Sequence, residues 1–354
     1  MEETEIVNFP NARVLAIESS CDETAAAIVE NGRIILGATV ASQMEIHARY
    51  GGVFPEVASR QHILSALPVV ENTLAEAHLA LNDLDAIAVT RGPGLAGSLL
   101  VGLNLAKGLA LGSGLPLIGV NHLEGHLYSA WVSPSNQGLP PEPRFPLMAL
   151  LVSGGHTELN LMRGHLDYTR LGATMDDAAG EAFDKVARLL NLPYPGGPSI
   201  QEAAIHGNPL AYKLPRAWLE DTWNFSFSGL KTAMLKLVQE LKGSGGPGIE
   251  GSPSLPVNDL AASFQAAVVE VLFKKTMTAA REYEVNEILL AGGVSANQAL
   301  RDVFLNQDEF PVNIPPLSLC TDNAAMIAAA GFYRLAHGYT DPLSIDILPT
   351  WPLS

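Results

Sequence analysis

A strand–turn–strand pattern that occurs twice in the chain restricts its possible folds more than any other feature. Residues 13–29 hold two apolar segments separated by a polar turn at 18–24. Residues 147–161 repeat this arrangement around the turn at 153–157. A supersecondary unit that is repeated in this way predicts a duplicated architecture with two related lobes.

The sequence between the two units alternates strand and helix signals. Residues 86–90 read as a strand, and an Ala-, Leu- and Gly-rich helix runs from the glycines at 92–97 to about residue 111. A short apolar strand follows at 116–120. Strands that alternate with helices favour an α/β fold with mixed sheets.

Two segments rich in proline, glycine and serine divide the chain. Five of the fourteen residues 133–146 are proline, which predicts the interdomain connection there. Eleven of the fourteen residues 243–256 are Gly, Pro or Ser, which predicts a surface loop between helices. We therefore expect an N-terminal lobe over residues 1–140 and a C-terminal lobe over 141–334, with residues 335–354 returning to the first lobe.

Charge and cysteine content limit the classes of function. The net charge is −16, from 21 basic and 37 acidic side chains, which argues against a broad phosphate-binding surface. If the chain handles RNA, it needs a local basic patch or a partner that supplies one. Two cysteines are too few for a disulfide framework, and the acidic N-terminus resembles neither a secretory signal nor a transit peptide. No uncharged apolar run reaches about 18 residues, so a cytoplasmic protein is expected.

His122 and His126 are the first candidates for metal ligands. Residues four apart share one face of a helix with about 6 Å between Cβ atoms, a spacing that suits two imidazoles on one metal. The pair follows the strand at 116–120, so it lies at a strand's carboxyl end, where sites in α/β proteins are common. Glu124 is about 200° around the helix from His122, so the protease pattern H-E-x-x-H is absent. Two unrelated helix histidines are the alternative.

Asp322, at the start of an Ala-rich helix, could provide a third ligand. Two histidines and one carboxylate form the open facial set that divalent iron uses and zinc often accepts. The alternative role of Asp322 is that of a helix N-cap. The sequence does not establish that the three positions meet in space.

Three glycine-rich turns could approach a phosphate. The turn at 92–98 is not a Walker loop, because Ser98 and Leu99 stand where Lys and Ser/Thr are required. The turn at 153–157 offers backbone N–H groups to a phosphate, and a tight hairpin is its equal alternative. Residues 289–297 read as a strand, a glycine pair and a helix, an arrangement that can hold a nucleotide.

The acidic run at 176–185 is expected to open a helix, with most of its acids as partners of the helix dipole. Asp184 lies one turn deeper and could bind a ribose hydroxyl. The turn at 194–198 contains Gly197, whose missing side chain would allow a ligand to approach. Five basic residues give only a faint indication of RNA: Lys213, Arg216, Lys231, Lys236 and Lys242.

Taken together, nine short strings resemble the TsaD/Kae/Gcp family in order and spacing. The match extends over about residues 13–353, and nine strings in register make a specific set. The strings lie at residues 18–24, 50–56, 92–95, 122–126, 152–157, 177–185, 225–232, 292–297 and 320–323.

The resemblance implies an actin-like (Hsp70/sugar-kinase, ASKHA) fold whose two lobes enclose a central cleft that holds a metal. It implies an acyltransferase that moves threonylcarbamoyl from L-threonylcarbamoyl-AMP to N6 of adenosine 37 in tRNAs reading ANN codons, giving t6A and AMP. The family's metal ligands correspond to His122, His126 and Asp322. Its substrate contacts correspond to Leu151, Val152, Ser153, Gly154, Gly155, Asp184, Gly197 and Asn297.

The resemblance also implies a cofactor and partners. The cofactor is one divalent metal per chain, with Fe²⁺ favoured over Zn²⁺. The partners are tRNA, bound transiently, a TsaB-like paralogue and a TsaE-like ATPase, while a TsaC/Sua-type synthase supplies threonylcarbamoyl-AMP. Archaeal relatives can add a tyrosine ligand from the second strand–turn unit, and the turn at 153–155 offers none, so the coordination sphere is expected to stay open.

Three other functions are alternatives to this one. A metallopeptidase would need a base beside His122. A small-molecule O-carbamoyltransferase is usually a longer chain with an extra C-terminal domain. A non-catalytic scaffold like the TsaB paralogue would lack the two-His helix. No residue stands out as a general base for the transfer reaction.

Overall fold

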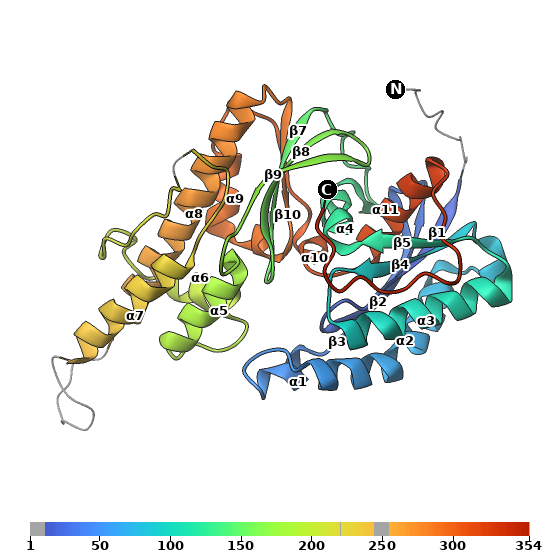
Figure 1. Ribbon diagram of the computed structural model, residues 1–354, viewed down its shortest axis with the longest axis horizontal. Coiled ribbons are helices and arrows are strands. Elements are labelled where there is room, and N and C mark those ends of the chain that lie inside the picture. The colour runs from blue at the N-terminus through green and yellow to red at the C-terminus, as the bar shows by residue number, and fades with distance from the viewer. Residues whose placement is uncertain (1–10, 220, 244–254, 354) are drawn as a thin grey trace. The chain divides into compact units, whose positions relative to one another are not determined.

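The computed structural model describes residues 11–219, 221–243 and 255–353, which divide into two compact units (Figure 1). Unit 1 comprises the chain up to residue 143 together with residues 164–168 and 315 onwards. Unit 2 comprises residues 144–163 and 169–314. The acidic N-terminus and most of the Gly/Pro/Ser-rich segment at 243–256 lie outside the described residues.

Unit 1 is built on a six-stranded mixed sheet. Its strands are β1 (Arg13–Glu18), β2 (Glu23–Glu30), β3 (Ile34–Ser42), β4 (Ala86–Gly92), β5 (Leu117–Asn121) and β6 (Ser133–Pro134). Their order is β5-β4-β1-β2-β3-β6, with β1 antiparallel to β2 and parallel to β4. The strand–turn–strand unit predicted near the N-terminus is thus confirmed, and it forms the centre of the sheet.

Helices cover both faces of this sheet (Figure 1). They are α1 (Met44–Ala48), α2 (Pro55–Ala77), α3 (Ala96–Ser113), α4 (His122–Tyr128), α10 (Leu317–Cys320) and α11 (Ala324–Ala336), with short 3₁₀ turns η1 (Leu81–Asp83) and η2 (Ser129–Trp131). On one face, Leu15 and Ile87 form a core with Leu103 of α3. On the other, α11 contacts β1, β2, β4 and β5, and α4 packs beside it. Because side chains alternate along a strand, Val14 and Ala88 face α11 while their neighbours face α3.

By length and composition, α3 is the one helix in the described part of the chain that could cross a membrane. Here it packs against β4 and α2. It also carries Lys107, whose ammonium group donates a hydrogen bond to the carbonyl of Ile345. In this structure α3 is therefore a helix of the layer that covers the sheet.

The second crossing of the chain into unit 1 comes at residue 315, whereas the sequence-based division places it at 335. The physical reason is α11, whose buried residues pack on the unit 1 sheet. Residues 339–353, which we call the C-terminal strap, continue over the same unit. The strap accepts a hydrogen bond from Gly94 at the Pro349 carbonyl (3.1 Å) and donates one from the Leu348 amide to the carbonyl of Arg91 (2.8 Å).

Unit 2 is built on a five-stranded mixed sheet in the order β11-β10-β7-β8-β9. The strands are β7 (Leu147–Val152), β8 (Thr157–Gly164), β9 (Asp167–Ala173), β10 (Glu287–Ala291) and β11 (Val312–Asn313). The helices are α5 (Ala179–Leu189), α6 (Gly196–Ala204), α7 (Ser228–Gly243), α8 (Val257–Glu282) and α9 (Gln298–Leu305), with the 3₁₀ turn η3 (Gly293–Ala296). Leu150 and Leu159 form its core with Phe183 of α5 and Phe264 of α8. The second strand–turn–strand unit is β7 and β8, as predicted.

Two acids that precede α5 have a different role from the one expected. The helix begins at Ala179, so Asp176 and Asp177 lie before its first turn. Their carboxylates accept hydrogen bonds from Ser226 and Ser228 (Asp176) and from Lys185 and Lys231 (Asp177). The prediction that they are partners of the helix dipole is wrong, because they tie the start of α5 to the segment that leads into α7.

Gly331 allows α11 to approach the unit 1 sheet closely, and its replacement tests that contact. A Cβ added at Gly331 would lie 2.7 Å from the Cβ of Ala88 on β4. We expect Gly331→Ala to lower the free energy of unfolding by about 1–3 kcal/mol, measured by urea denaturation. Gly108→Ala in α3, where an added Cβ meets nothing within 4 Å, is the matched control. It should be neutral or stabilising by up to about 1 kcal/mol, and equal effects of the two changes would contradict the close approach.

Candidate metal centre

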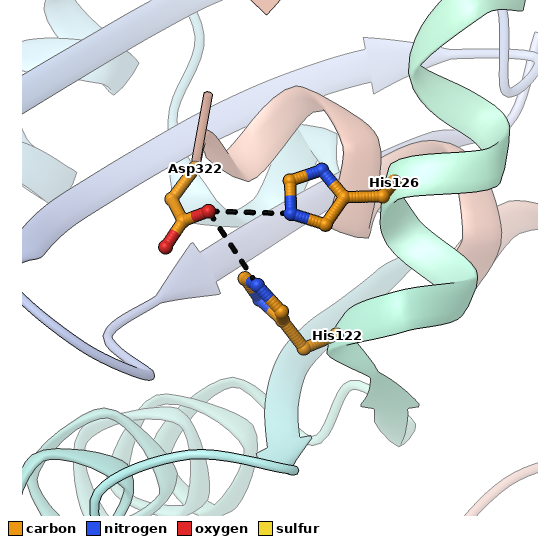
Figure 2. A group of neighbouring side chains, drawn as sticks. All are labelled: His122, His126 and Asp322. Carbon is orange, nitrogen blue, oxygen red and sulfur yellow. Dashed lines mark ion pairs between the residues drawn. The ribbon is translucent and has the colours of Figure 1, made fainter. Parts of the chain in front are cut away.

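The histidine pair lies on α4, a short helix that directly follows β5 (Figure 2). Asn121 is its N-cap, and the side-chain oxygen accepts a hydrogen bond from the amide of Leu123 (2.9 Å). The cap fixes the first turn of the helix and therefore the direction of His122. The two imidazoles are edge-to-face neighbours with ring centroids 4.7 Å apart. The predicted helix with both histidines on one face is confirmed.

Asp322 lies between α10 and α11 and points at both imidazoles (Figure 2). The N-cap of α11 is Asn323, which accepts a hydrogen bond from the amide of Met326 (3.0 Å). The alternative role of Asp322 as the helix cap is therefore wrong, and its carboxylate is available to the histidines. All three residues belong to unit 1, whereas the sequence-based division placed Asp322 in the second lobe.

The three side chains have the geometry of a ligand set for one metal ion. Asp322 Oδ1 is 3.5 Å from His122 Nε2 and 3.3 Å from His126 Nε2, and all three potential ligand atoms lie within 4.8 Å of one another. Ligands bound to an ion at about 2.1 Å are separated by roughly 3.0–3.4 Å in octahedral or tetrahedral geometry. The group therefore needs little movement to hold a divalent metal.

Burial leaves His126 well suited to bind a metal. Its side chain is fully buried, and among the described residues the one polar contact given for its ring nitrogens is Asp322 Oδ1, 3.3 Å from Nε2. Burial lowers the pKa of His126, which keeps the ring neutral near pH 7. A buried, neutral imidazole whose Nε2 faces a carboxylate at 3.3 Å can offer the lone pair of that nitrogen to a metal ion.

Glu18, at the end of β1, orients the other histidine. Its fully buried carboxylate is 3.0 Å from His122 Nδ1 and also accepts hydrogen bonds from the Ser20 amide and the Thr90 hydroxyl, both at 2.5 Å. With Nδ1 bound to Glu18, Nε2 faces Asp322. A carboxylate behind a histidine ligand fixes its tautomer and increases its basicity.

The charges around His122 reinforce one another. Burial alone would lower the pKa of His122, but Asp322 and Glu18 outweigh it and raise that pKa. Burial opposes ionisation of Glu18 as well, and the charge of His122 outweighs it to lower the pKa of this carboxyl. Because a metal takes the deprotonated ring, metal binding at this site would release a proton.

The role of Glu18 is not evident from the sequence. The only signal was the run of polar residues directly after a buried strand, a place where α/β proteins gather functional groups. Glu124, in contrast, turns away from the metal ligands as its helical position indicated. Both of its carboxylate oxygens bind Arg334, at 2.8 and 2.7 Å.

The glycine turn after β7 is open in unit 2. Leu151 and Val152 end the strand, and a Cβ added at Gly154 or Gly155 would meet nothing within 4 Å. The neighbouring backbone is close, because a Cβ at Gly292, after β10, would lie 2.5 Å from the carbonyl oxygen of Val152. The turn that follows β7 and the loop that follows β10 thus lie side by side at the carboxyl ends of parallel strands.

The other predicted substrate residues extend this region within unit 2. A Cβ added at Gly180, in the first turn of α5, would lie 2.6 Å from the carbonyl oxygen of Ser153. Asp184 accepts a hydrogen bond from the Gly196 amide (2.7 Å), which brings it beside Gly197. Asn297 caps α9 and contacts the 3₁₀ turn η3 that follows Gly292. Because α5 contacts α6 and η3, and β7 also contacts η3, these predicted residues lie on or next to neighbouring elements of unit 2: Leu151, Val152, Ser153, Gly154, Gly155, Asp184, Gly197 and Asn297.

Comparison with known proteins identifies the family of this chain. A family model described as TsaD, tRNA N6-adenosine threonylcarbamoyltransferase, matches residues 34–329. The chain belongs to the TsaD family. A TsaD-family protein of Thermomicrobium roseum with that same description is 54% identical over 352 residues and covers 96% of both chains. One from Geobacillus kaustophilus is 52% identical over 345 residues, again covering 96% of both chains.

Solved structures that resemble this TsaD-family chain share its fold at low sequence identity. HypF from T. kodakarensis matches with a TM-score of 0.60 at 15% identity, over 94% of this chain and 49% of that chain. The (R)-2-hydroxyglutaryl-CoA dehydratase component A of Acidaminococcus fermentans matches with a TM-score of 0.51 at 15% identity, over 92% of this chain and 99% of the other. The predicted actin-like fold is therefore confirmed.

Glu18 should control metal affinity without being a ligand. Glu18→Gln keeps the shape of the side chain but removes the charge behind His122, and we expect metal affinity to fall about 10- to 100-fold. Competition with a chelating dye measures the dissociation constant. Glu30→Gln, at the other end of the β1–β2 pair, is the control and should leave it unchanged. A folded Glu18→Gln protein with the original affinity would contradict the role of Glu18.

Proposed function

We propose that this chain transfers the threonylcarbamoyl group of L-threonylcarbamoyl-AMP to N6 of adenosine 37 in tRNAs that read ANN codons, giving t6A and AMP. The observation that carries the proposal is the identity of more than 50% over nearly the whole chain to proteins named tRNA N6-adenosine threonylcarbamoyltransferase. In the reaction the adenosine amine attacks the carbamoyl carbon, the bond from that carbon to the AMP phosphate oxygen breaks, and the amine proton leaves. We assign the general base to no side chain.

In this proposal His122, His126 and Asp322 hold one divalent metal, with Fe²⁺ favoured over Zn²⁺ because two histidines and a carboxylate are the facial set of non-haem iron. When bound, the ion supplies Lewis-acid polarisation of a carbamoyl or phosphate oxygen. Glu18 holds His122 in the tautomer that presents Nε2. Burial of both imidazoles and the shared carboxylate oxygen of Asp322 support this assignment.

The substrate contacts are proposed for unit 2. The amides of the turn at 153–155 orient the adenylate and neutralise charge on its phosphate. Asp184 binds a ribose hydroxyl, and Gly197 and Asn297 border the nucleotide. The open space beside Gly154, Gly155 and Gly197 supports this assignment, because backbone without a neighbouring side chain can approach a ligand closely.

We propose that the protein acts in the cytoplasm with protein partners. With a net charge of −16 the chain alone has few groups that neutralise tRNA phosphates, so a TsaB-like paralogue and a TsaE-like ATPase assist in binding tRNA. A TsaC/Sua-type synthase supplies threonylcarbamoyl-AMP. Exposed apolar side chains on α1, α2 and the segment between them support a protein partner: Met44, Tyr50, Phe54, Ile63, Leu64 and Leu67.

Removal of single ligands tests the metal and the reaction together. His122→Ala and Asp322→Ala should each lose most of the bound metal and about 100-fold or more of the transfer rate. The double variant should be no worse than either, because it cannot lose a metal that is already lost. Metal content is measured on protein purified without chelator, and transfer by t6A in a tRNA transcript incubated with threonylcarbamoyl-AMP and the partners.

His206→Ala, at an exposed histidine, is the control and should keep both metal and activity. Additive losses in the double variant would contradict a shared metal. Wild-type protein that makes no t6A but cleaves a glycoprotein would favour the metallopeptidase alternative.

Gly155→Val tests the nucleotide turn. A Cβ added at Gly155 meets nothing within 4 Å, so the fold should survive, whereas the side chain would fill the space proposed for the adenylate. We expect binding of threonylcarbamoyl-AMP to be abolished in calorimetry, with an unchanged melting temperature. Gly138→Val, at another exposed glycine with open space, is the control. A folded Gly155→Val protein that binds the adenylate normally would refute the assignment.

A further inference from the structure

An ion pair between a buried carboxylate and a part-buried guanidinium lies on the side of α4 that is turned away from the histidines. Glu124 is 2% exposed, and both of its carboxylate oxygens accept hydrogen bonds from Arg334, from Nε at 2.8 Å and from Nη2 at 2.7 Å. This bidentate geometry fixes the two planar groups in direction as well as distance. Arg334 lies in the last turn of α11, 210 residues away in sequence.

The pair joins the two helices that determine the positions of the metal ligands. α4 carries His122 and His126, and α11 begins two residues after Asp322. The helices are also in close contact, because a Cβ added at Gly125 would lie 2.6 Å from Cδ1 of Ile327. Close contact limits the distance between the helices, while the ion pair limits how far one can slide or turn along the other.

The C-terminal strap completes the arrangement through Trp351. The guanidinium carbon of Arg334 lies 5.9 Å from the centroid of the Trp351 ring, within the range of a cation–π contact. The Trp351 carbonyl accepts a hydrogen bond from the side-chain nitrogen of Asn121 (3.1 Å). Asn121 is the N-cap of α4, so one strap residue contacts both the start of α4 and the end of α11.

Stability alone does not account for an ion pair whose carboxylate is buried. Desolvation of a carboxylate and a guanidinium costs about as much as their attraction returns, and apolar residues of similar volume often stabilise as well. What apolar residues lack is the direction that two parallel N–H···O bonds impose. In a unit whose ligand atoms must meet within a few tenths of an ångström, direction is the property that matters.

We propose that Glu124, Arg334 and Trp351 are positioning residues that fix α4 against α11 and so set the distance between the histidine pair and Asp322. The inference rests on the metal centre of the proposed function. The contacts given for these three residues do not include His122, His126 or Asp322, the proposed metal ligands. The three residues therefore act on the ligands through the helices. Loss of any one should loosen the ligand geometry and weaken metal binding.

The test measures binding of Co²⁺, as a probe ion, to the full-length chain. Glu124→Gln keeps the shape of the side chain and removes its charge, and Trp351→Ala removes the ring without leaving a buried charge unpaired. We expect the Co²⁺ dissociation constant to rise about tenfold or more in both, with a changed visible ligand-field spectrum. Trp351→Phe should restore most of the affinity. In the variant that combines Glu124→Gln with Trp351→Ala, the loss of Co²⁺ affinity should be smaller than the sum of the two single losses, because both residues act on one helix contact.

Arg13→Gln, which breaks the Arg13–Glu30 pair at the far end of β1, is the matched control and should leave affinity and spectrum unchanged. A role confined to stability would lower the melting temperature of the metal-free variants but leave their Co²⁺ affinity and spectrum unchanged, and that result overturns the proposal. If Glu124→Gln does not fold, the Co²⁺ affinities of Trp351→Ala and Trp351→Phe are compared instead, and equal affinities would contradict the proposal. If His122→Ala in the same experiment binds Co²⁺ as tightly as the wild type, the metal centre itself fails instead.

Discussion

The carboxylate of Glu18 is the constraint on which much of unit 1 depends. A fully buried charge is costly unless every oxygen has a donor, and here three elements supply them. The donors come from the turn after β1, from Thr90 on β4 and from His122 on α4. Satisfying one carboxylate therefore aligns the centre of the sheet, its parallel neighbour and the helix that carries the histidines. A candidate site built on such rigid elements would need little adjustment to bind a metal.

The topology explains how ligands so far apart in sequence come together. The chain returns to unit 1 for the last time at residue 315, and α11 then covers the sheet face opposite α2 and α3. Asp322 lies beside the histidines because it comes just before α11 in the chain. The turns proposed to bind substrate in unit 2 are placed in a similar way, since they lie at the carboxyl ends of the parallel strands β7 and β10.

Local patterns in the sequence predicted the elements well and their long-range contacts poorly. The apolar strands, the glycine turns and the two-His helix were readable because each depends on neighbours within a few residues. Glu18 looked like an ordinary polar turn residue, and only β4 and α4 reveal that it is buried. The partners of Asp176 are about fifty residues away, and Glu124 meets Arg334 across 210. The end of the second lobe was misplaced because nothing local shows which sheet an Ala-rich helix will cover.

The late return of the chain also has a consequence for biosynthesis. While the ribosome is still translating unit 2, one face of the unit 1 sheet lacks its covering helix, since α11 ends only at Ala336. The growing chain therefore exposes apolar strand residues until α11 has been made, and exposed apolar surface of this kind makes a folding intermediate prone to aggregate. Its ligand set is incomplete during the same period, because Asp322 has not yet been made. A metal held by all three residues of the proposed set can therefore bind only after translation has passed Asp322.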